Sequence, residues 1–351
     1  MLKQQPIRVG IIGLGRAGWG MHCRELDARR ETFTVVAVCD PLSDRREKAQ
    51  ECFGCRIYEN AADLIADADV ELVDVASRTT DHYEHVRMAL EAGKHALVEK
   101  PMATTYAQAR ALQDLAARST GQLFVRHNRR FEPAFQHIRE IIAAGLLGDV
   151  FEVKLRRVRY QRRDDWQTLL AHGGGQLLNW GPHVVDHALQ FLDSPVKDMW
   201  SDLKRVAAVG NAEDHVKIVL RGENGRLVDL EISGGAALTE PEYMIWGSRG
   251  ALSCTGSTIT LRYIDPAAPL AERQADPGTP DSGYGTPEDL PWIEETFEAA
   301  PSNPVDISSM WDVLYAALRR GEPYPISLDE AVAVMRVISE ARRGTPFEID
   351  A

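Results

Sequence analysis

A glycine-rich turn between an apolar strand and a helix constrains the fold of this chain more than any other feature. Residues 13–18, GLGRAG, fit the pattern G-x-G-x-x-G and follow the apolar run 7–12, which is typical of a buried parallel strand. The three glycines allow a tight bend, close approach of a pyrophosphate, and close helix–strand packing, while the N–H groups of the helix start attract phosphates. We therefore expect a dinucleotide site formed by Gly13, Gly15, Arg16, Ala17 and Gly18.

Asp40 ends the second apolar run and bears on the choice of dinucleotide. A carboxylate at this position can accept hydrogen bonds from the adenosine ribose hydroxyls and repels a 2′-phosphate. The sequence therefore favours NAD, although Ser43, Arg45 and Arg46 lie close enough in sequence to receive a 2′-phosphate, so NADP stays possible.

The first third of the chain alternates apolar strands with amphipathic helices. This pattern predicts a doubly wound parallel sheet, an α/β Rossmann domain over residues 1–125. The expected strands are 7–12, 34–39, 70–76 and 96–99, and the expected helices run from the glycine turn to about 29, and over 44–52, 82–92 and 106–118.

From residue 126 the rhythm changes to closely spaced strands with turn residues between them. Neighbours of this kind indicate a second α/β domain, residues 126–351, with an open, mostly antiparallel sheet. We expect strands at 150–160, 198–209, 214–221, 226–234, 242–247, 250–255 and 258–264, helices at 131–144, 305–320 and 328–343, and a long loop at 265–305. Ser327 and Glu330 form the pattern of a capping box at the last helix.

Composition excludes several classes of protein. The 351 residues carry a net charge of −12, which argues against a protein that binds nucleic-acid phosphates. No apolar run is long enough to cross a bilayer, so we expect no membrane contact. The N-terminal apolar run fits a strand better than a signal sequence, which predicts a cytoplasmic protein.

The five cysteines favour reduced, buried thiols over a disulfide framework. Cys52 and Cys55 have redox-motif spacing but no second pair or histidine partners, and we expect no metal site.

Two segments carry candidate catalytic groups. Glu99-Lys100-Pro101 follows a sheet strand, and ligands of doubly wound sheets bind beyond the carboxyl ends of strands. Further along, Asn179, His183 and Asp186 (or His187) would share one stripe of a helix after a run of three glycines. A histidine there suits proton transfer, although a solvated lysine and a capping or packing histidine are the alternatives.

These motifs together resemble the Gfo/Idh/MocA oxidoreductases. Further similar stretches are Ala92-Gly-Lys-His95, Asn128-Arg-Arg-Phe131 and Gly145-Leu-Leu-Gly148. The resemblance covers essentially the whole chain. It implies hydride transfer at a sugar or polyol carbon, and a homodimer or homotetramer packed through the second sheet.

The resemblance also implies roles for individual residues. Lys100 resembles the family's catalytic lysine and His183 its general acid/base, whereas Asn179 stands where many members have Asp. A neutral amide can orient a neighbouring imidazole but cannot raise its basicity as a carboxylate does. The loop at Ser77 and His82 would border the cofactor together with Glu99.

Several side chains are candidate substrate contacts: Arg163, Trp166, Trp180, Asp186 and His187. Core packing is an equal alternative for the tryptophans. The basic residues Arg156, Arg157, Arg159, Arg162 and Arg163 could bind an anionic substrate, or could pair with acids on a strand face.

The leading functional prediction is an NAD(P)-dependent dehydrogenase or reductase acting on a sugar, polyol or related carbohydrate. Two alternatives remain from the sequence: a redox-neutral enzyme that recycles bound NAD while cleaving a glycoside, and a non-catalytic subunit that senses dinucleotide.

Overall fold

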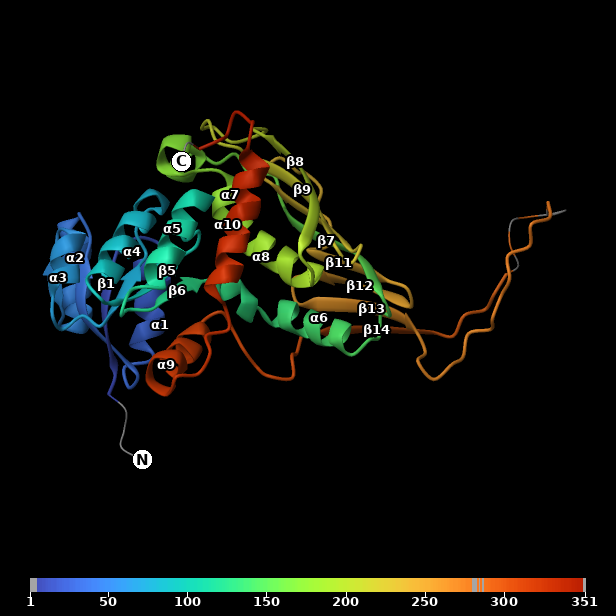
Figure 1. Ribbon diagram of the computed structural model, residues 1–351, viewed down its shortest axis with the longest axis horizontal. Helices are drawn as coiled ribbons and strands as arrows, with labels where there is room; N and C mark the ends of the chain where they lie inside the picture. Colours follow the sequence, from blue (N-terminus) through green and yellow to red (C-terminus); the bar gives the residue numbers. More distant parts are fainter. Residues whose placement is uncertain (1–4, 280–282, 284, 286, 350–351) are drawn as a thin grey trace.

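The computed structural model describes residues 5–279, 283, 285 and 287–349 as two sheets with helices packed between and around them. In Figure 1 the first sheet and its helices lie at one end and the second sheet at the other, with helix α10 running between them. The predicted fold class, a Rossmann domain followed by a domain with a mostly antiparallel sheet, is confirmed.

The first sheet has the order β3-β2-β1-β4-β5-β6, and all its pairings are parallel. Its strands are β1 (Ile7–Ile12), β2 (Phe33–Cys39), β3 (Arg56–Tyr58), β4 (Leu72–Val75), β5 (His95–Glu99) and β6 (Leu123–Arg126). The strand order reverses between β1 and β4, so the carboxyl ends of these two strands open the crevice in which doubly wound sheets bind ligands.

The helices of this domain match the predicted pattern with two additions, α3 and the irregular start of the first helix. They are α1 (Arg24–Asp27), α2 (Ser43–Phe53), α3 (Ala61–Ala66), α4 (His82–Glu91) and α5 (Tyr106–Ala116), with a short 3₁₀ turn η2 (Thr79–Asp81). The helix after the glycine turn begins as a wide π-helical segment, η1 (Gly18–Cys23). There the His22 amide bonds back to the Ala17 carbonyl at 3.0 Å, five residues earlier.

The second sheet has the order β14-β13-β12-β11-β7-β10-β9-β8. Only β7 and β10 pair in parallel, and the other pairings are antiparallel. Its strands are β7 (Val150–Val158), β8 (Val196–Lys204), β9 (His215–Gly222), β10 (Leu227–Ser233), β11 (Tyr243–Gly247), β12 (Gly250–Thr255), β13 (Thr258–Ile264) and β14 (Trp292–Glu298).

Strand β14 corrects the prediction of an unstructured loop over 265–305. It pairs with β13 from Thr258↔Glu298 to Ile264↔Trp292. The prediction was wrong because most residues of β14 are exposed at this edge of the sheet, so its sequence lacks the apolar alternation of a half-buried strand. The described residues between β13 and β14 extend away from the body of the molecule (Figure 1).

Helices cover one face of the second sheet. They are α6 (Pro133–Ala143), α7 (Gln176–Asn179) and α8 (Gly181–Leu192), with 3₁₀ turns η3 (Asn128–Phe131), η4 (Trp166–Thr168) and η5 (Leu170–His172). The prediction of a single helix with a polar stripe through residues 179–187 was wrong in two respects. The helix is interrupted at Trp180, because Pro182 has no N–H to continue the ladder, and His183, Asp186 and His187 are all buried.

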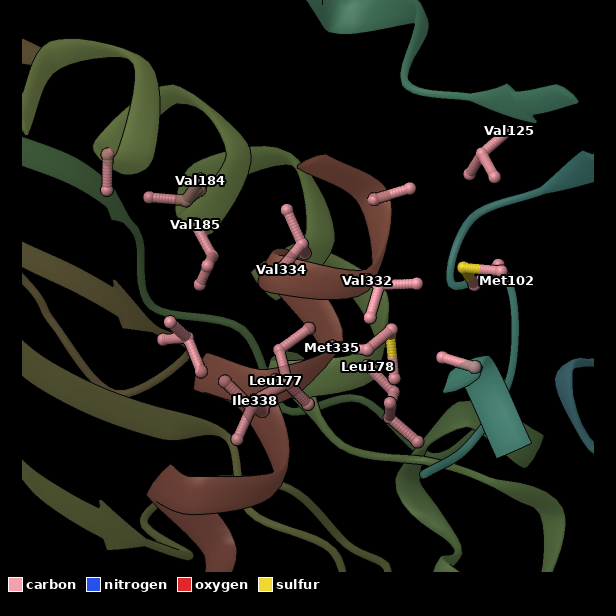
Figure 2. Packing of buried hydrophobic residues seen from close by; sticks show 14 of the residues in the cluster. Met102, Val125, Leu177, Leu178, Val184, Val185, Val332, Val334, Met335 and Ile338 are labelled. Atoms are coloured by element: carbon pink, nitrogen blue, oxygen red, sulfur yellow. The ribbon is translucent and has the colours of Figure 1, made fainter. Parts of the chain in front are cut away.

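The last two helices join the domains. Helix α10 (Leu328–Arg342) packs against both α5 and α8 with one continuous apolar cluster, in which Val332, Met335 and Ile338 meet Leu177, Leu178 and Val185 (Figure 2). Its predicted capping box, Ser327 with Glu330, is confirmed. Helix α9 (Met310–Arg320) begins later than predicted and inserts Trp311 and Leu314 into the Rossmann core beside Phe33.

Candidate active site

The glycine turn lies between the carboxyl ends of β1 and β4. Gly13 has φ +95°, and a Cβ there would lie 2.5 Å from the Ala76 carbonyl oxygen. A Cβ on Gly18 would lie 1.8 Å from the Gly13 carbonyl oxygen, so helix and strand approach more closely than any side chain permits. At Gly15, by contrast, the nearest atom to such a Cβ is the Arg45 Nη1 at 3.8 Å, which leaves room above the turn for a pyrophosphate. The residues present therefore fit a dinucleotide.

Asp40 is buried at the end of β2 and faces the glycine turn. Its Oδ2 accepts a hydrogen bond from the Leu14 amide at 2.8 Å, and its Oδ1 accepts one from the Leu42 amide at 3.0 Å. Arg45 approaches Oδ2 at 3.4 Å, and Arg46 donates to the Asp40 carbonyl oxygen at 2.6 Å. The adenosine end of the crevice thus contains both the carboxylate that suits ribose hydroxyls and an arginine that suits a phosphate.

Ser77 and His82 lie on the neighbouring loop after β4. Ser77 Oγ and His85 Nδ1 are 2.9 Å apart. The buried ring of His82 lies between two backbone carbonyls, 2.7 Å from that of Pro101 and 3.2 Å from that of Ser77. His82 therefore ties the Ser77 loop to the segment that carries Lys100.

Glu99 belongs to a buried network that no motif in the sequence indicated. His22 contacts Asp74 through Nδ1 at 2.7 Å and Glu99 through Nε2 at 2.9 Å. Arg126 donates to Glu99 at 3.0 Å and to Glu25 at 2.6 Å. Burial disfavours a charged imidazole, but the two carboxylates outweigh burial and Arg126 and raise the pKa of His22 to about 9. The acid in the apolar run 70–76, Asp74, was the signal that a buried partner was needed.

Lys100 lies directly after this network, where the Glu99 Oε2 also accepts a hydrogen bond from the Lys100 amide at 3.1 Å. Its ammonium donates to the backbone carbonyl of Asn179, the last residue of α7, at 2.9 Å. Burial lowers the pKa of Lys100. The positive charges of Arg16 and Arg129 lower this pKa further, whereas the negative charge of Glu99 raises it. This contact brings the Rossmann domain's Glu-Lys-Pro segment against the start of α8.

His183 lies in the first turn of α8, four residues after Asn179, whose backbone carbonyl accepts the hydrogen bond from Lys100. Its side chain is buried, and its Nδ1 has no hydrogen-bond partner among the residues that the structure describes. Burial, then Lys100 and Arg129, hold the pKa of His183 well below its usual value of 6.5. The imidazole is therefore neutral near pH 7 and can accept a proton.

Asp186 and His187 are engaged with protein groups. Asp186 receives two hydrogen bonds from the buried Arg130, at 2.6 and 2.8 Å. The ring of His187 stacks on Phe135, with Nε2 3.1 Å from the Arg129 carbonyl and Nδ1 3.2 Å from the Tyr243 hydroxyl. His187 still lines a small cavity beside His183, whereas Asp186 does not.

The remaining substrate candidates divide between two places. Arg163 bonds Asp165 and Gln167, and Gln167 reaches the Asn179 side chain at 3.4 Å. The guanidinium carbon of Arg78 lies 5.7 Å from the centre of the Trp166 ring. Trp180 instead borders the His183 cavity, where its ring packs against His183 and two guanidinium groups.

Known proteins match this chain along nearly its whole length. The family model described as "Oxidoreductase family, NAD-binding Rossmann fold" matches residues 7–127, and the "GFO/IDH/MocA C-terminal domain" matches residues 135–253. The chain belongs to the Gfo/Idh/MocA family. An uncharacterized oxidoreductase of Schizosaccharomyces pombe, C26H5.09c, is 32% identical over 80% of this chain and 76% of its own.

Two other similar proteins have a more specific description. The scyllo-inositol 2-dehydrogenase (NADP(+)) IolW of Bacillus subtilis is 25% identical over 97% of this chain and 94% of its own. The crystal structure of an NAD-binding protein from Listeria innocua superposes with a TM-score of 0.81 at 26% identity, covering 96% of this chain and 97% of that one. This Gfo/Idh/MocA protein thus has an NAD-binding Rossmann domain and sugar or polyol dehydrogenases among its relatives.

Neither a membrane-spanning helix nor a metal-binding cluster is found among the residues that the structure describes. Within residues 5–279, 283, 285 and 287–349, no helix is both long and apolar enough to cross a membrane. The same residues contain no cluster of three or more His, Cys, Asp or Glu side chains arranged to hold a metal ion.

Proposed function

We propose that this protein is an NAD(P)-dependent dehydrogenase or reductase that acts on the hydroxyl or keto carbon of a sugar, polyol or sugar derivative. The observation that carries the proposal is the convergence of Lys100 and the α7–α8 segment: the ammonium lies 2.9 Å from the Asn179 carbonyl, four residues before a buried, neutral histidine. Two similar proteins are named for substrates of this kind, scyllo-inositol and D-apiose.

The chemistry divides between the cofactor and two side chains. When bound, the nicotinamide supplies the hydride acceptor or donor. In the oxidative direction, His183 accepts the proton of the substrate hydroxyl, which its lowered pKa allows at neutral pH. Lys100 holds positive charge beside the oxygen as negative charge develops there. In the reductive direction His183 returns the proton.

Asn179 distinguishes this site from relatives with an aspartate at that position. Its backbone carbonyl receives the Lys100 ammonium, and its side-chain oxygen receives Gln167. We propose that Asn179 orients Lys100 and contacts a substrate hydroxyl, and that the charge on His183 is set without help from a neighbouring carboxylate.

The site proposal is tested by His183→Asn and Lys100→Met. We expect kcat to fall by about 10²- to 10⁴-fold in each, because general acid–base and electrostatic terms are lost. Steady-state assays on a sugar and polyol panel measure kcat, and quenching of NADH fluorescence checks that dinucleotide binding is unchanged. His215→Asn is the matched control, because its ring bonds only Ser233 on the second sheet. Near wild-type kcat in both variants would contradict the assignment.

For the cofactor we propose a preference for NAD over NADP, supported by the Asp40 carboxylate at the end of β2. Arg45 makes this preference modest, since it could pair with a 2′-phosphate. Comparison of kcat/KM for the two dinucleotides tests it, and Asp40→Ser is expected to move the ratio toward NADP.

A further inference from the structure

The five arginines between residues 156 and 163 do not act as one group. Successive side chains of strand β7 point to opposite faces of the sheet, so the side chains of Arg156 and Arg157 point in opposite directions. Arg156 lies toward the open face, where it bonds Asp229 at 2.9 Å, although it also borders the cavity beside His183. Arg157 lies on the helix-covered face with Val153 and Leu155, and it lines the cavity beside His183.

Arg157 has no carboxylate partner among the residues that the structure describes, unlike Arg156, which pairs with Asp229, and Arg163, which pairs with Asp165. Its guanidinium lies 4.1 Å from the centre of the Trp180 ring. The two carboxylates of the same cavity are already engaged: Glu132 pairs with Arg129, and Glu242 Oε2 accepts the Gly256 amide at 2.9 Å. A guanidinium stacked on an indole is held in place yet keeps its in-plane N–H donors available.

The cavity itself limits what Arg157 can bind. Its volume is about 30 Å³, room for about two water molecules or a small planar group rather than a sugar ring. It is lined by Arg129, Arg157, Trp180, His183, His187 and Tyr243, among others. Three arginines, Arg129, Arg156 and Arg157, line the cavity against two carboxylates, Glu132 and Glu242. A planar carboxylate is the group of this size that a guanidinium binds through two parallel hydrogen bonds.

We propose that the substrate is a carboxylated one, a sugar acid or polyol acid whose carboxylate binds Arg157 in this cavity while the reacting hydroxyl faces His183 and Lys100. This inference rests on the proposed function and narrows its substrate class. Arg157 acts as the specificity determinant: it anchors one end of the substrate, so that the carbon to be oxidised is held at a fixed distance from the anchor.

Binding to the NADH-loaded enzyme tests the proposal without requiring turnover. The probes are matched pairs, D-glucuronate with D-glucose and D-galacturonate with D-galactose, with D-glucose 6-phosphate as a further arm, and the readout is NADH fluorescence. We expect at least one acid to bind about 10- to 100-fold more tightly than its neutral partner. Arg157→Met should remove this preference, so that binding of the acid falls by about 10- to 100-fold more than binding of its neutral partner.

The control is Arg262→Met, which removes an arginine that also stacks on an indole, Trp292 at 4.7 Å, but on the exposed face of strand β13 and outside the cavity. Equal binding of acid and neutral sugars, a preference for the phosphate, or an acid preference that survives Arg157→Met would overturn the proposal. Tight acid binding without NADH or NAD⁺ turnover would leave it intact and count instead against the proposed dehydrogenase activity.

Discussion

The surroundings of His183 determine the pH range in which it can act as a base. Burial, Lys100 and Arg129 all lower its pKa, so the ring loses its proton well below pH 6.5. We expect kcat/KM for oxidation to be flat across pH 6.5–7.5 and to fall only at lower pH, as the imidazole becomes protonated. Arg129→Gln removes one of the positive charges, so the acid limb should move to higher pH.

The pH–rate profiles of wild type and Arg129→Gln measure this shift directly. Arg139→Gln is the control, since Arg139 lies on the exposed side of α6 against Phe135 and is not among the groups that perturb His183. An acid limb that stays in place in Arg129→Gln would mean that burial and Lys100 set the pKa of His183 without Arg129.

His22 gives the protein a second, separate pH dependence, this time of stability. Its pKa is about 9 in the folded protein, against 6.5 for a solvated histidine in the unfolded chain, so folding favours the protonated ring. The resulting stabilisation is complete below pH 6.5 and is lost as pH rises through 9, on the order of 3 kcal/mol. His22→Gln cannot titrate, so the free energy of unfolding should lose this slope. Urea unfolding between pH 6.5 and 9.5 measures both proteins, and equal slopes would contradict the prediction.

At the scale of elements, a buried ion pair fixes the approach to α7. Arg342, at the end of α10, donates to Glu213 at 2.9 Å and to the Gly174 carbonyl at 3.2 Å. Glu213 in turn accepts the Leu177 amide at 3.1 Å, and a Cβ on Gly175 would lie 2.3 Å from its carboxylate. The three glycines at 173–175 are thus where the backbone folds over Glu213, which places α7 and the start of α8 relative to α10.

Arg342→Met should therefore destabilise the protein by about 3–5 kcal/mol, because it leaves a buried carboxylate without its cation. Adding Glu213→Gln should recover part of that loss. In a double-mutant cycle measured by urea unfolding, the two changes in the free energy of unfolding should therefore not be additive. Arg343→Met changes the next residue, which is exposed and pairs only with Glu340 on the surface, and should cost less than about 0.5 kcal/mol. Additive effects at 342 and 213 would show that the pair is not coupled.

Sequence periodicity predicted the elements that are buried on one face or on both. It missed elements that are very short or mostly exposed. Strands β1, β2 and β5 are mostly apolar because both faces of the parallel sheet are covered. Strand β3 is three residues long and β14 is mostly exposed, so neither has a readable pattern. In the site, local motifs identified Lys100 and His183, but the His22 network joins residues from positions 22 to 126, and no spacing in the sequence specifies such a contact.

At the scale of the whole molecule, both domains contribute residues to the proposed site. Lys100 and the glycine turn come from the first domain, and His183 and Arg157 from the second. Helix α10 packs against α5 in one domain and α8 in the other, with Ser339 accepting the Tyr106 amide at 2.8 Å. A single apolar cluster therefore fixes the position of the elements that carry the proposed cofactor and substrate contacts (Figure 2).

The open face of the second sheet leads to the last prediction. Helices cover only one face, and the register places Trp200, Leu227 and Trp246 on the other, all partly exposed. The charged side chains around them are paired with one another: Asp229 forms ion pairs with both Arg156 and Lys217. Large aromatic side chains among neutralised charges are typical of a surface that packs against another subunit. We expect the chain to form a dimer or tetramer through this face.

Sedimentation velocity on wild type and on the double variant Trp200→Asp with Trp246→Asp tests the expected association. The variant should sediment as a monomer, because two buried aspartates per subunit would lack partners at the interface. Leu42→Asp is the control, since this side chain is 48% exposed but lies on the Rossmann domain. A monomeric wild type would exclude association, and an unchanged oligomer in the double variant would place the interface elsewhere. Because Arg157 and His183 lie on the opposite, helix-covered side of the sheet, the monomeric variant should still bind NADH.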